Sequence, residues 1–227
     1  YLIHNYKLGE AAKLIYEFTW NDFCDWYVEF LKPRFNIKDS KIQSQNEILL
    51  TQILNDILLM LNPFMPHITE ELWHILNNHS QNKLLSLQSW PSISNDYINH
   101  ELEKSFEEFF EIIRLIRNLR AELGLKPSQQ ISIYLISNNK KLLNFLSNLI
   151  QDIKIFTKSE NVYISTEIEF NKADFAKSFS GIVGDLEIYL PFEGIINLDI
   201  LRERLKKDFM KVNKEIEALN TRIKNKN

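Results

Sequence analysis

Cysteine and glycine are scarce in this sequence, and long apolar runs are missing. The single cysteine, Cys24, excludes an internal disulfide and is typical of a reduced, cytoplasmic protein. Only five glycines occur, and none belongs to a phosphate-binding loop of the GxGxxG or GxxxxGK[ST] type. No apolar run approaches the roughly 18 to 20 residues of a membrane-spanning helix. We therefore expect no membrane contact and no bound nucleotide.

Metal-binding spacing is also missing. The five histidines stand at no ligand spacing from one another or from Cys24. We expect no metal site and no catalytic residue in the chain.

The charge that is present is unevenly distributed. The 227 residues are 44% hydrophobic and 25% charged, as in an ordinary globular protein, and carry a net charge of -3. Residues 198–227 hold nine Lys or Arg against five Asp or Glu, a balance of +4, which leaves -7 for the remainder. This asymmetry suggests a basic appendage on an acidic body.

Both ends predict a piece cut from a longer protein. The chain starts at Tyr1, without a methionine or a signal-peptide pattern. It stops within a helical pattern, with no glycine or other stop signal in the last turn.

Apolar residues repeat at helical spacing in the first half of the chain, which predicts an antiparallel helix bundle. The predicted helices span about 6–32, 47–61, 67–77 and 99–123. Pro33 is expected to end the first helix, and Gly124 with Pro127 the fourth. In the third helix Ile68, Leu72, Ile75 and Leu76 share one side, and Trp73 is expected at its edge.

The pattern changes after Pro127. Strands are predicted at 130–136, 161–170 and 184–192, with a helix at 140–150 between the first two. This is a small α/β unit. A long helix follows from Leu198, and its apolar residues alternate at spacings of four and three, as in a heptad repeat that needs a partner helix. The seam residues are Leu205, Phe209, Val212, Ile216, Leu219 and Ile223.

Five sequence blocks, in order, resemble one family. WNDFCDWYVE at 20–29 is similar to the first-helix signature of valyl-tRNA synthetases, and LNPFMPHITEELW at 61–73 to a segment shared with isoleucyl and leucyl enzymes. SWP at 89–91, IRNLRAE at 116–122 and LPFEG at 190–194 continue in the valyl order, the last before the family's coiled-coil arm. The chain thus resembles the carboxy-terminal part of a valyl-tRNA synthetase over nearly its full length.

The resemblance implies a mainly α fold in three parts. Residues 1–127 would form an antiparallel helix bundle of the class Ia synthetase anticodon-binding type, 128–196 a small α/β connecting domain, and 197–227 the first helix of a coiled-coil tRNA-binding arm. The implied partner is valine-accepting tRNA. The family uses ATP with Mg on a domain carrying HIGH- and KMSKS-type motifs, which do not occur here, so we expect no cofactor and no activity in this chain.

Two sets of basic residues are candidates for contacts with tRNA phosphates. Arg114, Arg117 and Arg120 follow one another at a spacing of three on the fourth helix, which predicts that they lie along one side of it, away from Ile113, Ile116 and Leu119. Ion pairing with Glu111 or Glu122 is the alternative. The second set lies on the arm, where an ordinary solvated helix face is the alternative. It comprises Arg202, Arg204, Lys206, Lys207, Lys211, Lys214, Arg222 and Lys224.

Other interpretations stay open. The aromatics Phe18, Trp20, Phe23, Trp26 and Tyr27 could stack on RNA bases, although helical spacing favours a place in the core. The chain could instead be the equivalent region of an isoleucyl or leucyl enzyme. It could also be a stand-alone interaction module whose coil dimerises and binds no RNA. A monomer is expected for the parent protein, and a dimer through the coil for the truncated chain.

Overall fold

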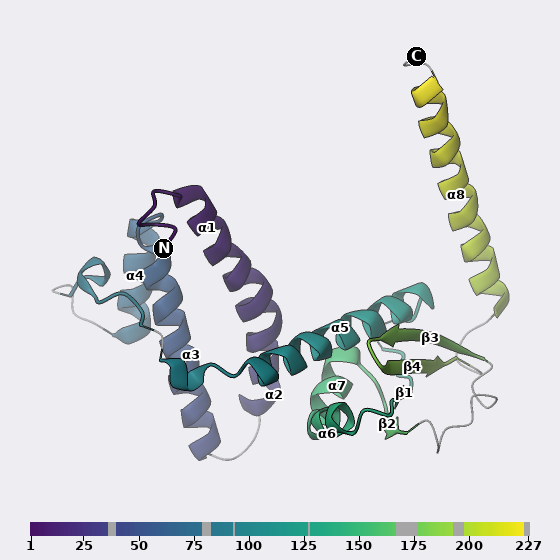
Figure 1. The fold of residues 1–227 in the computed structure, drawn as a ribbon, viewed down its shortest axis with the longest axis horizontal. Coiled ribbons are helices and arrows are strands. Elements are labelled where there is room, and N and C mark those ends of the chain that lie inside the picture. Colours follow the sequence, from purple (N-terminus) through teal and green to yellow (C-terminus); the bar gives the residue numbers. More distant parts are fainter. Residues whose placement is uncertain are drawn as a thin grey trace. The chain divides into compact units, whose positions relative to one another are not determined.

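A computed structural model describes residues 1–35, 40–78, 83–92, 94–126, 128–166, 177–192 and 198–224. The chain divides into two compact units, Tyr1–Ile98 and Asn99–Asn227 (Figure 1). Each unit is described by itself.

The first unit is helical. Its elements are α1 (Leu8–Glu17), the π-helix η1 (Phe18–Tyr27), α2 (Val28–Phe35), α3 (Ser40–Leu61), α4 (Pro66–Asn77) and the 3₁₀ turns η2 (Leu85–Leu87) and η3 (Asn95–Tyr97). α3 packs against α1 and α2 with one side and against α4 with the other (Figure 1). Pro66 begins α4 at a position where its missing N–H costs nothing, and Asn78 ends it in the left-handed conformation.

The expectation that Pro33 ends the first helix is wrong, because α2 continues to Phe35. A proline removes one backbone donor, and close to the last turn of a helix few bonds depend on it. The second predicted helix is also longer than expected, since α3 begins at Ser40 rather than near residue 47.

Trp73 lies at the centre of packing in the first unit, not at its edge as predicted. Its side chain is only 6% exposed and forms a core cluster with Leu58 and Leu85. The helix is held in this rotation by a reciprocal pair of side-chain hydrogen bonds between Asn55 and Asn77, at 3.1 and 2.8 Å. The predicted apolar side of α4 is exposed instead, at Ile68, Leu72 and Ile75.

The second unit contains a sheet with helices. Its elements are α5 (His100–Glu122), β1 (Ile133–Ile136), α6 (Lys140–Asn148), α7 (Ile150–Thr157), β2 (Val162–Ser165), β3 (Ser178–Val183), β4 (Leu186–Pro191) and α8 (Leu198–Lys224). The four strands have the order β2-β1-β4-β3, and only the β1–β2 pair is parallel. A parallel pair needs a crossover, which α6 and α7 supply.

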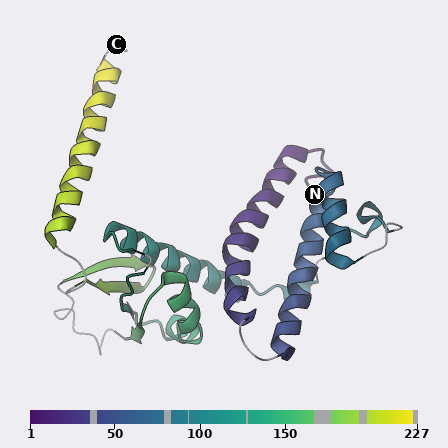
Figure 2. The ribbon, with the colours of Figure 1, turned by 180° about the vertical axis from the view of Figure 1, so that it is seen from behind.

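The helices cover the sheet face that carries the core. In register across the sheet, Leu135 of β1 and Ile188 of β4 are fully buried, whereas their neighbours Tyr134 and Glu187 are only partly buried. α5 contacts β3, α6 and α7 (Figure 2). Its side chains Phe109, Ile112, Ile113 and Ile116 supply the matching buried stripe.

The structure therefore groups the fourth predicted helix with the sheet. Asn99 caps the start of α5: its side-chain oxygen accepts a hydrogen bond from the Leu102 N–H at 3.0 Å. Helical periodicity shows that a stripe will be buried but not against which element. The predicted division into domains at 127 and 196 stays a prediction.

Local signals placed the other elements with uneven success. Strands β1, β2 and β4 lie within the predicted segments, although residues 167–170 of the second segment lie outside the described residues. Strand β3 and helix α7 were missed. The long helix from Leu198 is present as α8.

Candidate nucleic-acid interface

The three arginines of α5 do not lie on one face of the helix. Arg114 and Arg117 are exposed, whereas Arg120 is 7% exposed. Each step of three residues turns about 60° short of a full circle at 3.6 residues per turn, so Arg120 has rotated about 120° from Arg114. That rotation carries Arg120 into the buried stripe beside Leu119 and Leu123.

Arg120 joins the end of α5 to the segment that precedes β1. Its Nη2 donates a hydrogen bond to the carbonyl of Gln129 at 2.8 Å, while its Nη1 is buried and has no hydrogen-bond partner. Burial lowers the pKa of the Arg120 guanidinium from its ordinary value. Arg120 thus has a structural role in part, which no pattern in the sequence predicts.

Arg117 is held against α7. Its Nε donates to the carbonyl of Phe156 at 3.0 Å, and its guanidinium carbon lies 5.6 Å from the centre of the Phe156 ring. Arg117 and Arg120 line a cavity of about 390 Å³ together with Lys158, which follows α7. Lys158 was not among the predicted candidates, because a lone lysine after a helix carries no signal in the sequence.

The basic residues of α8 are displayed to solvent where their side chains are described. Arg202, Lys206, Lys207, Lys211 and Lys214 are exposed, and Lys206 lies 3.6 Å from Glu203. The side chains of Arg204, Arg222 and Lys224 lie outside the described residues. An exposed row of cations can contact phosphates whatever the base sequence.

The apolar seam of α8 is also exposed in part. Phe209, Val212 and Ile216 are exposed, whereas the side chains of Leu205, Leu219 and Ile223 lie outside the described residues. An exposed apolar stripe on a single helix is the arrangement that a partner helix covers in a coiled coil.

The aromatic residues of the first helix divide between core and surface. Phe23 and Trp26 are buried in η1, as their spacing predicted. Trp20 is exposed, and its ring lies 6.3 Å from that of Tyr16 with an angle of 7° between the planes. An exposed parallel pair of this kind can stack on a further planar group.

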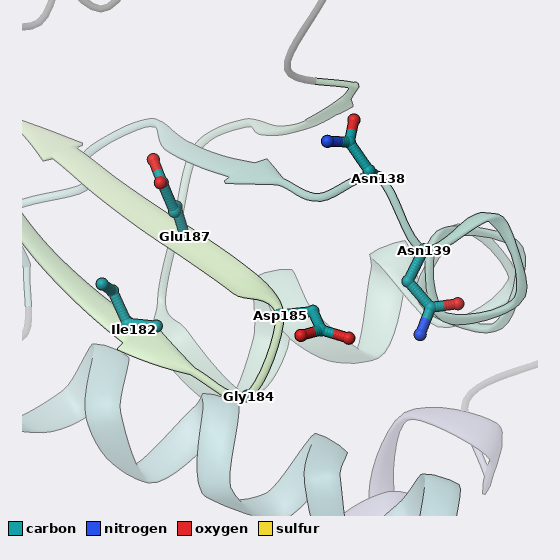
Figure 3. A pocket seen from close by; sticks show the side chains of 6 residues that line it. All are labelled: Asn138, Asn139, Ile182, Gly184, Asp185 and Glu187. Atoms are coloured by element: carbon teal, nitrogen blue, oxygen red, sulfur yellow. The ribbon is translucent and has the colours of Figure 1, made fainter.

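A second cavity, of about 470 Å³, lies at one end of the sheet. Figure 3 shows Asn138 and Asn139 on the segment between β1 and α6, Asp185 at the turn between β3 and β4, and Glu187 on β4. Burial, with the nearby Asp185 charge as a second cause, raises the pKa of Glu108 on the adjacent α5. The lining contains two amides and two carboxylates, and the negative charges of Asp185 and Glu187 repel phosphate.

Tyrosines cross the open sheet face beside that cavity. Tyr134 of β1 is paired in register with Tyr163 of β2 and with Tyr189 of β4, and the rings of Tyr134 and Tyr163 lie 4.7 Å apart. The Tyr189 hydroxyl donates to Glu187 at 2.6 Å. The alternation within the strands gave the side of each residue but not its cross-strand neighbours.

The described residues offer neither a metal site nor a membrane span. They contain no group of three His, Cys, Asp or Glu side chains placed to hold a metal ion, and Cys24 is exposed. None of the helices in the described ranges is both long enough and apolar enough to cross a membrane.

More than half of the chain matches a known family. The model of the anticodon-binding domain of tRNA ligase matches residues 1–135. The chain belongs to this family. The match runs through α1 to α5 and ends within β1, so it includes both the aromatic helix and the arginines of α5.

Curated relatives extend the similarity to the whole chain. A valine–tRNA ligase from Prochlorococcus marinus subsp. pastoris is 59% identical over 226 residues, covering 100% of this chain. Ligases of the same name from a second Prochlorococcus marinus strain and from Parasynechococcus marenigrum are 46% and 40% identical, each covering 98% of it. The predicted resemblance to valyl-tRNA synthetases is confirmed. The chain spans about a quarter of the length of these relatives (25%, 24% and 25%).

Proposed function

We propose that this chain is the tRNA-binding and tRNA-positioning portion of an ATP-dependent valine–tRNA ligase. The observation that carries the proposal is the agreement between the family match over residues 1–135 and valine–tRNA ligase relatives that align over the whole chain. The proposal favours the valyl enzyme over the isoleucyl and leucyl alternatives.

The parts of the chain would divide the work. The helical residues before 127 would support the anticodon stem-loop, with the exposed Arg114 and Arg117 as phosphate contacts. Residues 128–196 would connect this body to the arm. Helix α8 would be the first helix of a coiled-coil arm that braces the outer corner of the tRNA through Arg202, Lys206, Lys207, Lys211 and Lys214.

Holding the tRNA at two separated places would fix the direction of its acceptor end. Such positioning contributes to catalysis by removing rotational freedom before the reaction, without contact with the reacting atoms. The matched relatives are four times longer than this chain, and the domain that binds ATP with Mg would lie elsewhere in the parent protein. We propose that the chain alone does not aminoacylate tRNA, and that the parent is a cytoplasmic monomer.

The direct test measures binding of the chain to valine tRNA and to a non-cognate tRNA at about 50 and about 200 mM salt. We expect weak binding that falls steeply with salt and discriminates little between the two, because phosphate contacts carry no base information. Absence of binding to either tRNA at the lower salt would contradict the proposal.

Charge reversal on α8 separates the two tRNA-binding parts. Replacing Lys206, Lys211 and Lys214 by Glu in the full-length ligase is expected to weaken tRNA binding and to reduce its salt dependence. The matched variant replaces three exposed lysines of the first unit, Lys7, Lys13 and Lys41, and is expected to have a smaller effect. Equal affinities for the α8 variant and the unmodified ligase would remove α8 from the proposal.

A further inference from the structure

Positively charged side chains line the cavity beside α5 and α7. Its lining includes Arg117 and Arg120 of α5 and Lys158 after α7, with Leu125, Phe156 and Thr157 as neutral walls. None of the described residues that line it is acidic. The cavity volume of about 390 Å³ exceeds by an order of magnitude the roughly 30 Å³ that one water molecule occupies in the liquid.

The two arginines also have a structural role, because each donates a hydrogen bond to a backbone carbonyl. Helix carbonyls near a C-terminus lack partners within the helix and attract cations. Arg117 satisfies the Phe156 carbonyl in the last turn of α7, and Arg120 satisfies the Gln129 carbonyl after the end of α5.

The carbonyl contact of Arg120 does not balance its positive charge. Arg120 is 7% exposed, and within the described part of the chain its Nη1 has no hydrogen-bond partner and no carboxylate pairs with it. A buried cation without a counter-charge is costly, whereas a charge-assisted hydrogen bond to an anion offsets that cost. The lowered pKa of Arg120, caused by burial, agrees with an uncompensated charge.

Lys158 adds an exposed donor to the lining of the cavity. It ends α7 in the left-handed conformation with φ of 52°, which fixes its backbone while its side chain stays exposed. None of the described residues forms a hydrogen bond or ion pair with its side chain, so the ammonium group is available to a ligand. The cavity lining thus combines the buried charge of Arg120 with the exposed side chains of Arg117 and Lys158.

We propose that this cavity binds a single phosphate group, supplied by the RNA backbone when tRNA is bound. The chemistry matches, because guanidinium and ammonium groups are the usual protein donors to phosphate. Arg117 and Lys158 donate to the phosphate oxygens, and Arg120 supplies the charge behind them. The inference rests on the proposed function for its RNA source and adds Lys158 to the residues predicted from sequence.

The first arm of the test uses inorganic phosphate and no RNA. Thermal unfolding of the chain is followed in phosphate and in chloride at equal ionic strength, for the unmodified chain, for Lys158→Asn and for Lys140→Asn. Asparagine tolerates the left-handed conformation, so Lys158→Asn removes a charge without backbone strain. Lys140 is exposed at the start of α6 and does not line the cavity, so Lys140→Asn removes the same charge from another place in the unit.

We expect phosphate to raise the unfolding temperature of the unmodified chain and of Lys140→Asn by the same amount. Lys158→Asn is expected to bind phosphate at least about tenfold more weakly, as for the loss of one charge-assisted bond. General stabilisation by phosphate through exclusion from the surface would act on all three proteins equally. Equal increases in all three would therefore overturn the proposal.

The second arm measures tRNA affinity against salt for the same three proteins. We expect Lys158→Asn, but not Lys140→Asn, to weaken binding and to reduce the salt slope by about one phosphate contact. If all three bind tRNA equally while phosphate still stabilises through Lys158, the cavity takes a free phosphate and the RNA source is overturned. If no protein binds tRNA, the proposed function fails, and the phosphate arm still decides whether the cavity is an anion site.

Discussion

Arg117 contacts Phe156 at two places, the backbone carbonyl and the aromatic ring. The Arg117 Nε donates to the Phe156 carbonyl at 3.0 Å, and the guanidinium lies over the Phe156 ring at 5.6 Å from its centre. The two residues are far apart in the chain but link α5 to the last turn of α7. One side chain therefore connects the helix that packs on β3 with the crossover between β1 and β2.

Replacing Arg117 by Met tests this link. Methionine keeps much of the aliphatic length but removes both the hydrogen bond and the cation–π contact. We expect the free energy of unfolding of the second unit to fall by about 1–2 kcal/mol. The measurement is denaturant unfolding followed by circular dichroism. The matched control is Arg114→Met, one turn earlier and exposed, for which we expect a change within about 0.5 kcal/mol. Equal losses in both variants would contradict the link.

Two leucines of the same short turn test the core of the first unit. Leu85 is 1% exposed and packs with Leu58 and Trp73, whereas Leu87 is 78% exposed. Leu85→Ala is expected to lower the free energy of unfolding by about 2–4 kcal/mol, through lost burial and the cavity that remains. Leu87→Ala is expected to change it by less than about 0.5 kcal/mol. Tryptophan fluorescence during urea unfolding reports on the first unit, which holds all four tryptophans, Trp73 of the cluster among them. Similar losses of unfolding free energy in the two variants would contradict a place for Leu85 in this core.

The sequence predicted local structure better than partnership. The spacing of Phe109, Ile113 and Ile116 correctly marked a buried stripe, and Asn99 gave the start of α5. Neither shows whether the stripe meets helices or a sheet, since both bury the same apolar surface. Strand β3 was missed because its burial does not alternate cleanly between a covered and an open face. The helical register of Trp73 was misjudged because the Asn55–Asn77 bonds that fix it join different helices.

The candidate site was predictable only as a list of basic residues. Sequence named Arg114, Arg117 and Arg120 but treated them alike, because the drift of a three-residue spacing matters only when the buried stripe is known. Lys158 becomes a candidate only when α7 is packed against α5. The roles of these residues in RNA binding remain predictions.

Glu108 is expected to make the stability of the second unit depend on pH. Burial and then the Asp185 charge raise its pKa above the ordinary value of 4.5. Because the folded chain holds this proton more tightly than the unfolded chain, stability falls as pH rises from about 4.5 through the raised pKa. Glu108→Gln is expected to remove that loss and so to be at least as stable as the unmodified chain at pH 7.

The measurement compares urea unfolding of Glu108→Gln and Glu107→Gln with the unmodified chain at several pH values between about 4 and 8. Glu107 is the exposed neighbour on the same helix and serves as the control. We expect the advantage of Glu108→Gln to grow with pH and that of Glu107→Gln to stay flat. A Glu108→Gln variant that is less stable at pH 7 than at pH 4, relative to the unmodified chain, would contradict the prediction.

The exposed seam of α8 predicts that this chain self-associates. Phe209, Val212 and Ile216 are exposed, and the heptad pattern continues on both sides of them. Two copies can bury these stripes against each other when no second helix is supplied by the same chain. Sedimentation equilibrium is expected to show a dimer that Val212→Glu with Ile216→Glu abolishes, because a buried unpaired carboxylate is costly. The control, Asn213→Glu with Glu217→Gln, alters exposed neighbours outside the seam, keeps the net charge and should leave the dimer intact.

In a longer chain that supplies the second arm helix, the dimer should disappear while tRNA binding improves. A dimer that persisted there would favour a stand-alone interaction module instead.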